Sequence, residues 1–117
     1  MKKVPIEVDS VEPHRRGKIY RMRIGGKVVK ILVTFHCLKR MEKWDIDIND
    51  LLGTLLFPEE VLKGHFDRYI AHKRSGDHII RTVYEYESEV PIVLTVYFPY
   101  ASRYYQGGKT YEDKILT

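Results

Sequence analysis

The sequence predicts an α+β domain in which two short helices pack on one face of an antiparallel sheet that carries an N-terminal β-hairpin. Three observations support this prediction: a glycine turn within 18–33, two amphipathic helical segments within 34–58, and three strand-like segments after residue 67. A chain of 117 residues can bury one modest core but not two. We therefore expect a single domain over residues 1–117.

The composition is that of a globular protein, with 44% hydrophobic and 31% charged residues. The single cysteine, Cys37, excludes an internal disulfide and a thiolate zinc cluster, which fits a reducing cytoplasm. No apolar segment approaches the roughly 20 residues that span a bilayer, and the first residues lack the apolar part of a signal peptide. We expect a cytoplasmic protein with no membrane partner, no metal and no cofactor.

The formal net charge of +4 and the pI of about 9.1 make a polyanion such as RNA a natural partner. Acidic residues are nevertheless spread among the basic ones, so charge alone does not decide between function classes. Many Lys, Glu and Arg residues are also typical of proteins from hot environments, where surface ion-pair networks add stability.

The N-terminal part of the chain is predicted to form an arm followed by a hairpin. Residues 1–17 show weak alternation and two prolines, which favours an arm or an edge strand. Residues 18–33 are centred on Gly25-Gly26, which tolerates the positive φ angles of a two-residue turn. Pairing across that turn gives one apolar face. That face contains Tyr20, Met22, Val29 and Ile31.

A first helix is predicted from Phe35 to about Lys43, because Thr34 is a good N-cap residue. His36 and Arg40 are four residues apart and therefore lie side by side along this helix. The two side chains could contact one ligand together.

A second helix is predicted after Asp47, which together with Asp50 resembles a capping signal. Pro58 ends this helix. Its apolar stripe is strong, and we expect it in the core. The stripe consists of Ile48, Leu51, Leu52, Leu55 and Leu56.

From Asp67 onward the pattern predicts three antiparallel strands. A one-residue slip between the last two strands would place Arg81 on the buried face, so we expect the register that avoids this. In that register the helix-covered face holds Ile80, Thr82, Tyr84, Ile92, Leu94, Val96 and Phe98. The opposite, open face holds Arg68, His72, Arg81, Thr95 and Tyr97. The last residues, 106–117, lack periodicity and are expected to be a flexible tail or an arm onto a partner subunit.

Four segments follow one another in a familiar order: a helix opening FHCLKRMEK, a second helix ending in FP, the segment RYIAHKRSGDHIIRTVYEY, and a strand closing on LTVYFPYASRY. This order resembles the RelE/ParE-like toxin superfamily, most nearly the BrnT-type toxins and a related family of small domains of unknown function. The resemblance covers 34–105, the family-like core. It implies helices on one face of an antiparallel sheet and, in the active toxins, RNA cleavage on the open face by basic, histidine and tyrosine or serine residues.

The resemblance also implies positions for the site. Carried over to this sequence, the family-like residues are His36, Arg40, Arg68, His72, Arg81, Ser102 and Arg103. The chain departs from the compact toxins by its added hairpin and N-terminal arm, which could cover the open face or form a homodimer.

Metal-free RNA cleavage needs a base for the 2′-hydroxyl proton, an acid for the leaving oxygen and cations for the phosphorane charge. His72 is the candidate base or acid, because an unshifted imidazole titrates near neutral pH. Arg81 would grip the phosphate in a forked contact, and Tyr97 would stack on a base or supply a hydroxyl. The candidate catalytic residues are His72, Arg81, His36 and Tyr97. The candidate RNA-binding residues are Arg40, Arg68, Ser102 and Arg103.

Each candidate also has a structural interpretation. Arg68 could pair with Glu85 on an exposed sheet face, and His36 could cap or shield the start of its helix. The sequence-based hypothesis is a metal-independent endoribonuclease, the toxin of a toxin-antitoxin pair with an antitoxin protein as partner. The alternative is a noncatalytic module that binds nucleic acid or protein through the same face. Whether the protein is an enzyme stays open at this point.

Overall fold

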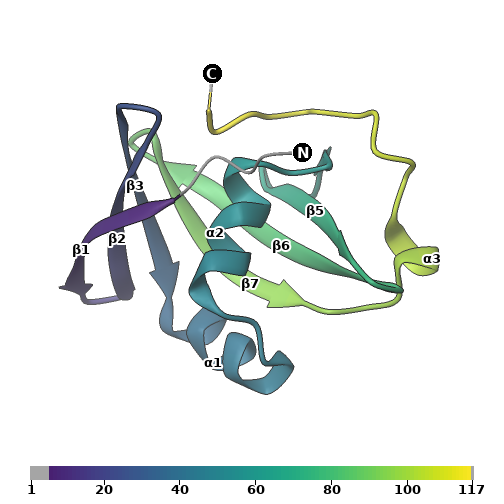
Figure 1. Cartoon of the computed structure of the whole chain (residues 1–117), viewed down its shortest axis with the longest axis horizontal. Coiled ribbons are helices and arrows are strands. Elements are labelled where there is room, and N and C mark those ends of the chain that lie inside the picture. The colour runs from purple at the N-terminus through teal and green to yellow at the C-terminus, as the bar shows by residue number, and fades with distance from the viewer. Residues whose placement is uncertain (1–5, 117) are drawn as a thin grey trace.

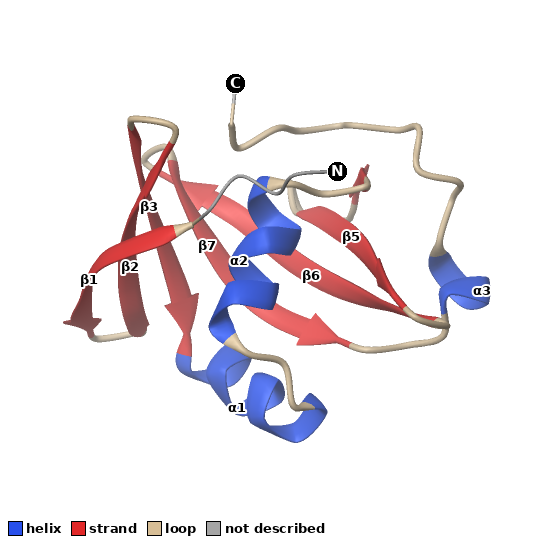
Figure 2. Cartoon of the chain, viewed as in Figure 1, coloured by secondary structure: helices blue, strands red, loops and turns tan. Residues whose placement is uncertain are grey.

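The computed structural model describes residues 6–116 and contains one seven-stranded sheet with the strand order β1-β2-β3-β7-β6-β5-β4. Helix α2 lies across one face of this sheet and α1 lies at the ends of β3 and β7 (Figure 1), and Figure 2 distinguishes helices from strands. The strands are β1 (Glu7–His14), β2 (Gly17–Ile24), β3 (Lys27–Thr34), β4 (Glu60–Lys63), β5 (Tyr69–Ser75), β6 (His78–Glu87) and β7 (Val90–Tyr97). The helices are α1 (Phe35–Trp44), α2 (Ile48–Leu56) and the single turn α3 (Ala101–Tyr104). The predicted α+β class is confirmed.

The N-terminal hairpin has the predicted turn and register. Gly25 and Gly26 have φ angles of 53° and 83°, which suit a tight hairpin turn. Tyr20 pairs with Ile31, so the predicted apolar face forms. The preceding arm contributes β1, which pairs with β2 as an edge strand, whereas residues 1–5 lie outside the described part of the chain.

The hairpin joins the rest of the sheet through the pair β3 and β7, which is parallel while the other strand pairs are antiparallel. The chain between these two strands contains both long helices and the strands β4 to β6. A parallel pair needs such a crossover. The crossover places α1 at the ends of β3 and β7 and carries α2 across one face of the sheet (Figure 1).

Both helices begin where the sequence predicts. The Thr34 hydroxyl accepts a hydrogen bond from the Cys37 amide at 3.2 Å, and the Asp47 carboxylate accepts one from the Asp50 amide at 2.8 Å. The predicted stripe of α2 lies in the core beside buried Met41 of α1. In the part of the chain that the structure describes, no helix is long and apolar enough to cross a membrane.

The register around Arg81 is as predicted, but the following part of β7 is not. Arg81 pairs with Tyr97, and two positions further along the strand Val83 pairs with Thr95. The next pair joins Tyr84 to Val93, so Leu94 is an extra residue in β7. Because a bulge reverses the alternation, Val93 packs in the core, and the prediction of Ile92 and Leu94 on the helix-covered face was wrong.

Two further features were not predicted. The short strand β4 forms the far edge of the sheet, in a segment that gave no strand signal. The C-terminal segment lies along that edge, since the Val61 amide donates to the Thr110 carbonyl at 2.8 Å and the Glu112 amide donates to the Val61 carbonyl at 2.9 Å. Residues 110–112, part of the yellow trace in Figure 1, therefore bond to the sheet of their own chain, which corrects the expectation of a flexible tail or an intersubunit arm.

Candidate functional site

Four polar side chains from four adjacent strands form one row across the sheet. Glu60 of β4 is the register partner of His72 of β5, His72 is the partner of Arg81 of β6, and Arg81 is the partner of Tyr97 of β7. Ala71, the neighbour of His72, lies in the helix-covered core. Because side chains alternate along a strand, the row lies on the face opposite α2, the open face predicted for its last three members.

The first three members are joined by hydrogen bonds and are called the Glu-His-Arg triad below. Glu60 Oε2 lies 2.6 Å from His72 Nδ1, and Arg81 Nη1 lies 2.9 Å from His72 Nε2. A guanidinium can only donate hydrogen bonds, so Nε2 must be the acceptor. The proton of the neutral imidazole then sits on Nδ1 and is donated to the carboxylate. The contacts therefore select one tautomer of His72.

Glu60 and His72 are fully buried although they belong to the open face. The C-terminal segment provides part of their cover. The Gln106 amide donates to both oxygens of Glu60, at 3.1 and 2.9 Å, and the Gly108 amide donates to Oε1 at 2.9 Å. A buried carboxylate with these donors can keep its charge.

The electrostatics support an ionised Glu60 and a neutral His72. Burial raises the pKa of Glu60, but the hydrogen bonds from His72, Gln106 and Gly108 outweigh it and hold the pKa below its usual value. Burial, reinforced by the charge of Arg81 and opposed by Glu60, lowers the pKa of His72. Burial also lowers the pKa of Arg81, whose ordinary value is so high that the guanidinium stays charged.

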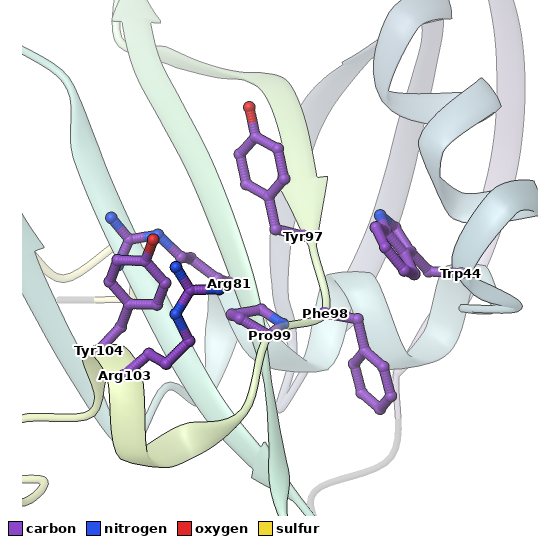
Figure 3. Close-up of a pocket in the computed structure, with 7 residues that line it drawn as sticks. All are labelled: Trp44, Arg81, Tyr97, Phe98, Pro99, Arg103 and Tyr104. Atoms are coloured by element: carbon purple, nitrogen blue, oxygen red, sulfur yellow. The ribbon is translucent and has the colours of Figure 1, made fainter.

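Arg81 contributes to the wall of a cleft of about 390 Å³, called the arginine cleft below. The Arg81 guanidinium lies 4.2 Å from the centre of the Tyr104 ring, and that of Arg103 lies 5.4 Å from the same ring. Figure 3 shows both arginines beside Tyr104. The Arg40 guanidinium lies 5.9 Å from the centre of the Tyr97 ring. The cleft is lined by Trp44, Arg81, Tyr97, Phe98, Pro99, Arg103 and Tyr104.

The structure brings together five of the eight residues predicted for the site. Arg81, Tyr97 and Arg103 line the cleft, Arg40 stacks on Tyr97 from α1, and His72 supports Arg81 from inside. Because His72 is buried with both ring nitrogens engaged, it has no atom to offer a ligand. We therefore assign it a positioning role in place of the predicted role as base or acid.

The other three predicted residues lie elsewhere. Arg68 precedes β5 and pairs with Glu85 at 3.2 Å, as its structural interpretation predicted. His36 is exposed in the first turn of α1, and Ser102 is exposed on α3 without lining the cleft. The hydroxyl of Thr95, also predicted for the open face, is buried without a hydrogen-bond partner among the described residues.

Sequence reasoning missed Glu60, Trp44 and Tyr104. Glu60 follows directly on FPE, in a segment too short to show strand alternation. Trp44 is the last residue of α1 and its apolar ring is typical of a core side chain, whereas Tyr104 is one of several tyrosines near the C-terminus. A row of polar partners across four strands becomes visible only once β4 is paired.

Comparisons with known proteins give one result. A family model described as "Domain of unknown function (DUF4258)" matches residues 33–98, more than half of the chain. No curated protein and no solved structure matches significantly. Within residues 6–116, no group of His, Cys, Asp and Glu side chains is arranged to hold a metal ion. The matched region contains the whole polar row from Glu60 to Tyr97, and the chain belongs to the DUF4258 family.

Proposed function

We propose that the arginine cleft binds single-stranded RNA, with a phosphate on Arg81 and an adjacent unstacked base on the aromatic side chains. The observation that carries the proposal is the setting of Arg81. Its guanidinium is held between His72 Nε2 and the Tyr104 ring at the wall of a cleft. A guanidinium fixed in this way loses little entropy when it forks onto a phosphate.

The other lining residues support a nucleotide as the ligand. Arg103 adds positive charge beside Tyr104, Arg40 adds it beside Tyr97, and Tyr97 is 39% exposed. Aromatic rings stack on bases of any sequence, at about 1–3 kcal/mol per base, provided that the base is unpaired. The volume also falls in the range of ordinary ligand pockets, roughly 300–1,000 Å³.

The binding test compares a fluorescently labelled single-stranded RNA with a duplex of the same sequence. Arg81→Ala should weaken binding to the single strand by at least about tenfold, the loss of one charged hydrogen-bonded contact. Arg23→Ala is the matched control, because it removes the same charge from an exposed position on β2. Equal losses in the two variants, or tighter binding to the duplex, would show that the cleft is not the site.

A second candidate function, metal-independent RNA cleavage, is favoured by the position of Tyr97 directly opposite Arg81. In this reaction the 2′-oxygen attacks phosphorus, the bond to the 5′-oxygen breaks, and a 2′,3′-cyclic phosphate forms. Arg81 would stabilise the charge on the phosphorane, the Tyr97 hydroxyl would donate a proton to the leaving 5′-oxygen, and solvent water would take the proton of the 2′-hydroxyl. The protein would then be an endoribonuclease toxin whose partner is an antitoxin protein.

Cleavage is tested with the same RNA in the presence of EDTA, with mass spectrometry to identify a cyclic phosphate. Tyr97→Phe should abolish cleavage while it leaves binding within about twofold, because the ring remains for stacking. Binding without any cleavage from pH 5 to 9 would leave RNA binding as the function of the cleft.

A further inference from the structure

We infer that Tyr104, Gln106 and Gly108 form a latch that positions Arg81 through the Glu-His-Arg triad, and that this latch sets the affinity of the cleft for a phosphate. The inference rests on the proposed function. It assigns a role in ligand binding to a segment outside the matched family region.

The latch holds the triad at its buried end. Backbone amides of Gln106 and Gly108 supply three contacts of 2.9–3.1 Å to the two oxygens of Glu60. Hydrogen bonds to a carboxylate are short and strong, so the carboxylate has one favoured orientation. Its Oε2 then receives the Nδ1 proton of His72 at 2.6 Å.

The same latch holds the triad at its cleft end. With the proton fixed on Nδ1, the lone pair of His72 Nε2 is directed at Arg81 Nη1. Tyr104 stacks on the guanidinium at 4.2 Å. Gln106 and Gly108 thus contact the carboxylate of Glu60, and Tyr104 contacts the guanidinium of Arg81. A shift of this short segment would therefore change both contacts at once.

The latch is anchored at each side by contacts that do not involve the triad. The Tyr105 amide donates to the Ala101 carbonyl at 2.9 Å, and the Tyr105 hydroxyl donates to Glu59 at 3.3 Å. Further along, the hydroxyl of Tyr84 donates to Asp113 at 2.7 Å. The segment therefore has a defined path over β4.

Two adjacent glycines allow a matched test. Gly107 and Gly108 both have positive φ angles, 98° and 77°, so alanine is strained at either position. A Cβ at Gly107 would meet nothing within 4 Å, whereas one at Gly108 would lie 2.4 Å from the Tyr105 hydroxyl. Glu59 holds the Tyr105 hydroxyl and the Arg74 guanidinium lies 5.1 Å from its ring, so Gly108→Ala should displace the amide that donates to Glu60 as well as Tyr105, and Gly107→Ala should displace neither.

Affinity for the single-stranded RNA and the ¹⁵N NMR shifts of the His72 ring are measured in both variants. Gly108→Ala should weaken RNA binding about tenfold, the loss of one hydrogen bond to a charged group, and should shift the Nε2 signal of His72. Gly107→Ala should stay within about twofold of the unmodified protein with an unchanged ring signal. Equal effects in the two variants, or a Gly108→Ala protein with normal affinity and a normal ring signal, would overturn the latch.

The ring signal separates this inference from the proposed function. A protein that binds no RNA but whose His72 signal responds only to Gly108→Ala would retain the latch and lose the RNA proposal. If Gly108→Ala does not fold, Glu60→Gln replaces it, since the amide keeps the shape of the side chain but not its charge. Unchanged His72 shifts in Glu60→Gln would contradict the inference.

Discussion

Each half of the sheet has a cross-strand pair in which a nitrogen donor faces a glutamate, but the two pairs lie in opposite environments. On the N-terminal hairpin side, Arg21 of β2 reaches Glu12 of β1 at 2.8 Å, with both side chains more than 40% exposed. On the other side, Glu60 and His72 are 2.6 Å apart and fully buried. Exposed pairs are screened by water, while buried ones must be completely satisfied to persist. Only the buried side builds a positioned cation at a cleft.

The largest difference between the two halves should appear on removal of a carboxylate. Glu60→Ala leaves the Nδ1 proton of His72 and two backbone amides without their acceptor, so the free energy of unfolding should fall by about 3–5 kcal/mol. Urea denaturation measures this loss. Glu12→Ala, which removes the exposed carboxylate paired with Arg21 on the hairpin side, is the control and should cost about 1 kcal/mol or less. A similar loss of stability in both variants would show that the buried carboxylate contributes no more than the exposed one.

The sequence predicts a feature well when side-chain burial determines it, and poorly when backbone hydrogen bonds determine it. The stripe of α2 and the register at Arg81 were predicted because burial of apolar groups, and exclusion of a charge from the core, dictate them. The bulge at Leu94 was missed because residues 90–94 are all apolar, so either alternation looks acceptable there. Glu60 was missed because its partners at 106 and 108 act through backbone amides, which every residue except proline carries.

A fall in pH should have the next largest effect, because it should destabilise the half of the sheet that contains buried His72. The pKa of His72 is lowered in the folded protein, so below about pH 6.5 the unfolded chain takes up a proton that the folded chain refuses. Stability is thus complete above that pH and falls as the pH drops toward the folded pKa, by at most about 1.4 kcal/mol per pH unit. The groups that face His72, Glu60 from β4 and Arg81 from β6, keep their charges in this window.

The measurement is the free energy of unfolding at pH 7, 6 and 5 for the unmodified protein and for His72→Gln. The variant lacks the titrating group, so its curve should be flatter between pH 6.5 and 5, whatever its absolute stability. Below about pH 4.5 both proteins should lose further stability, because Glu60 also has a lowered folded pKa. Parallel curves down to pH 5 would mean that His72 accepts a proton in the folded state without cost.

The smallest effect is expected for the exposed pair. Arg21→Ala should change the free energy of unfolding by about 1 kcal/mol or less, since Arg21 and Glu12 are both solvated without each other. Because a Debye length falls from about 10 Å at 0.1 M salt to 3 Å at 1 M, that small difference should shrink further in concentrated NaCl, while the loss in Glu60→Ala should persist. A salt-insensitive cost above 2 kcal/mol for Arg21→Ala would place the hairpin pair in the same class as the buried triad. The cost of breaking a cross-strand pair would then be similar in both halves, and the burial of Glu60 under the C-terminal segment would not explain its larger contribution to stability.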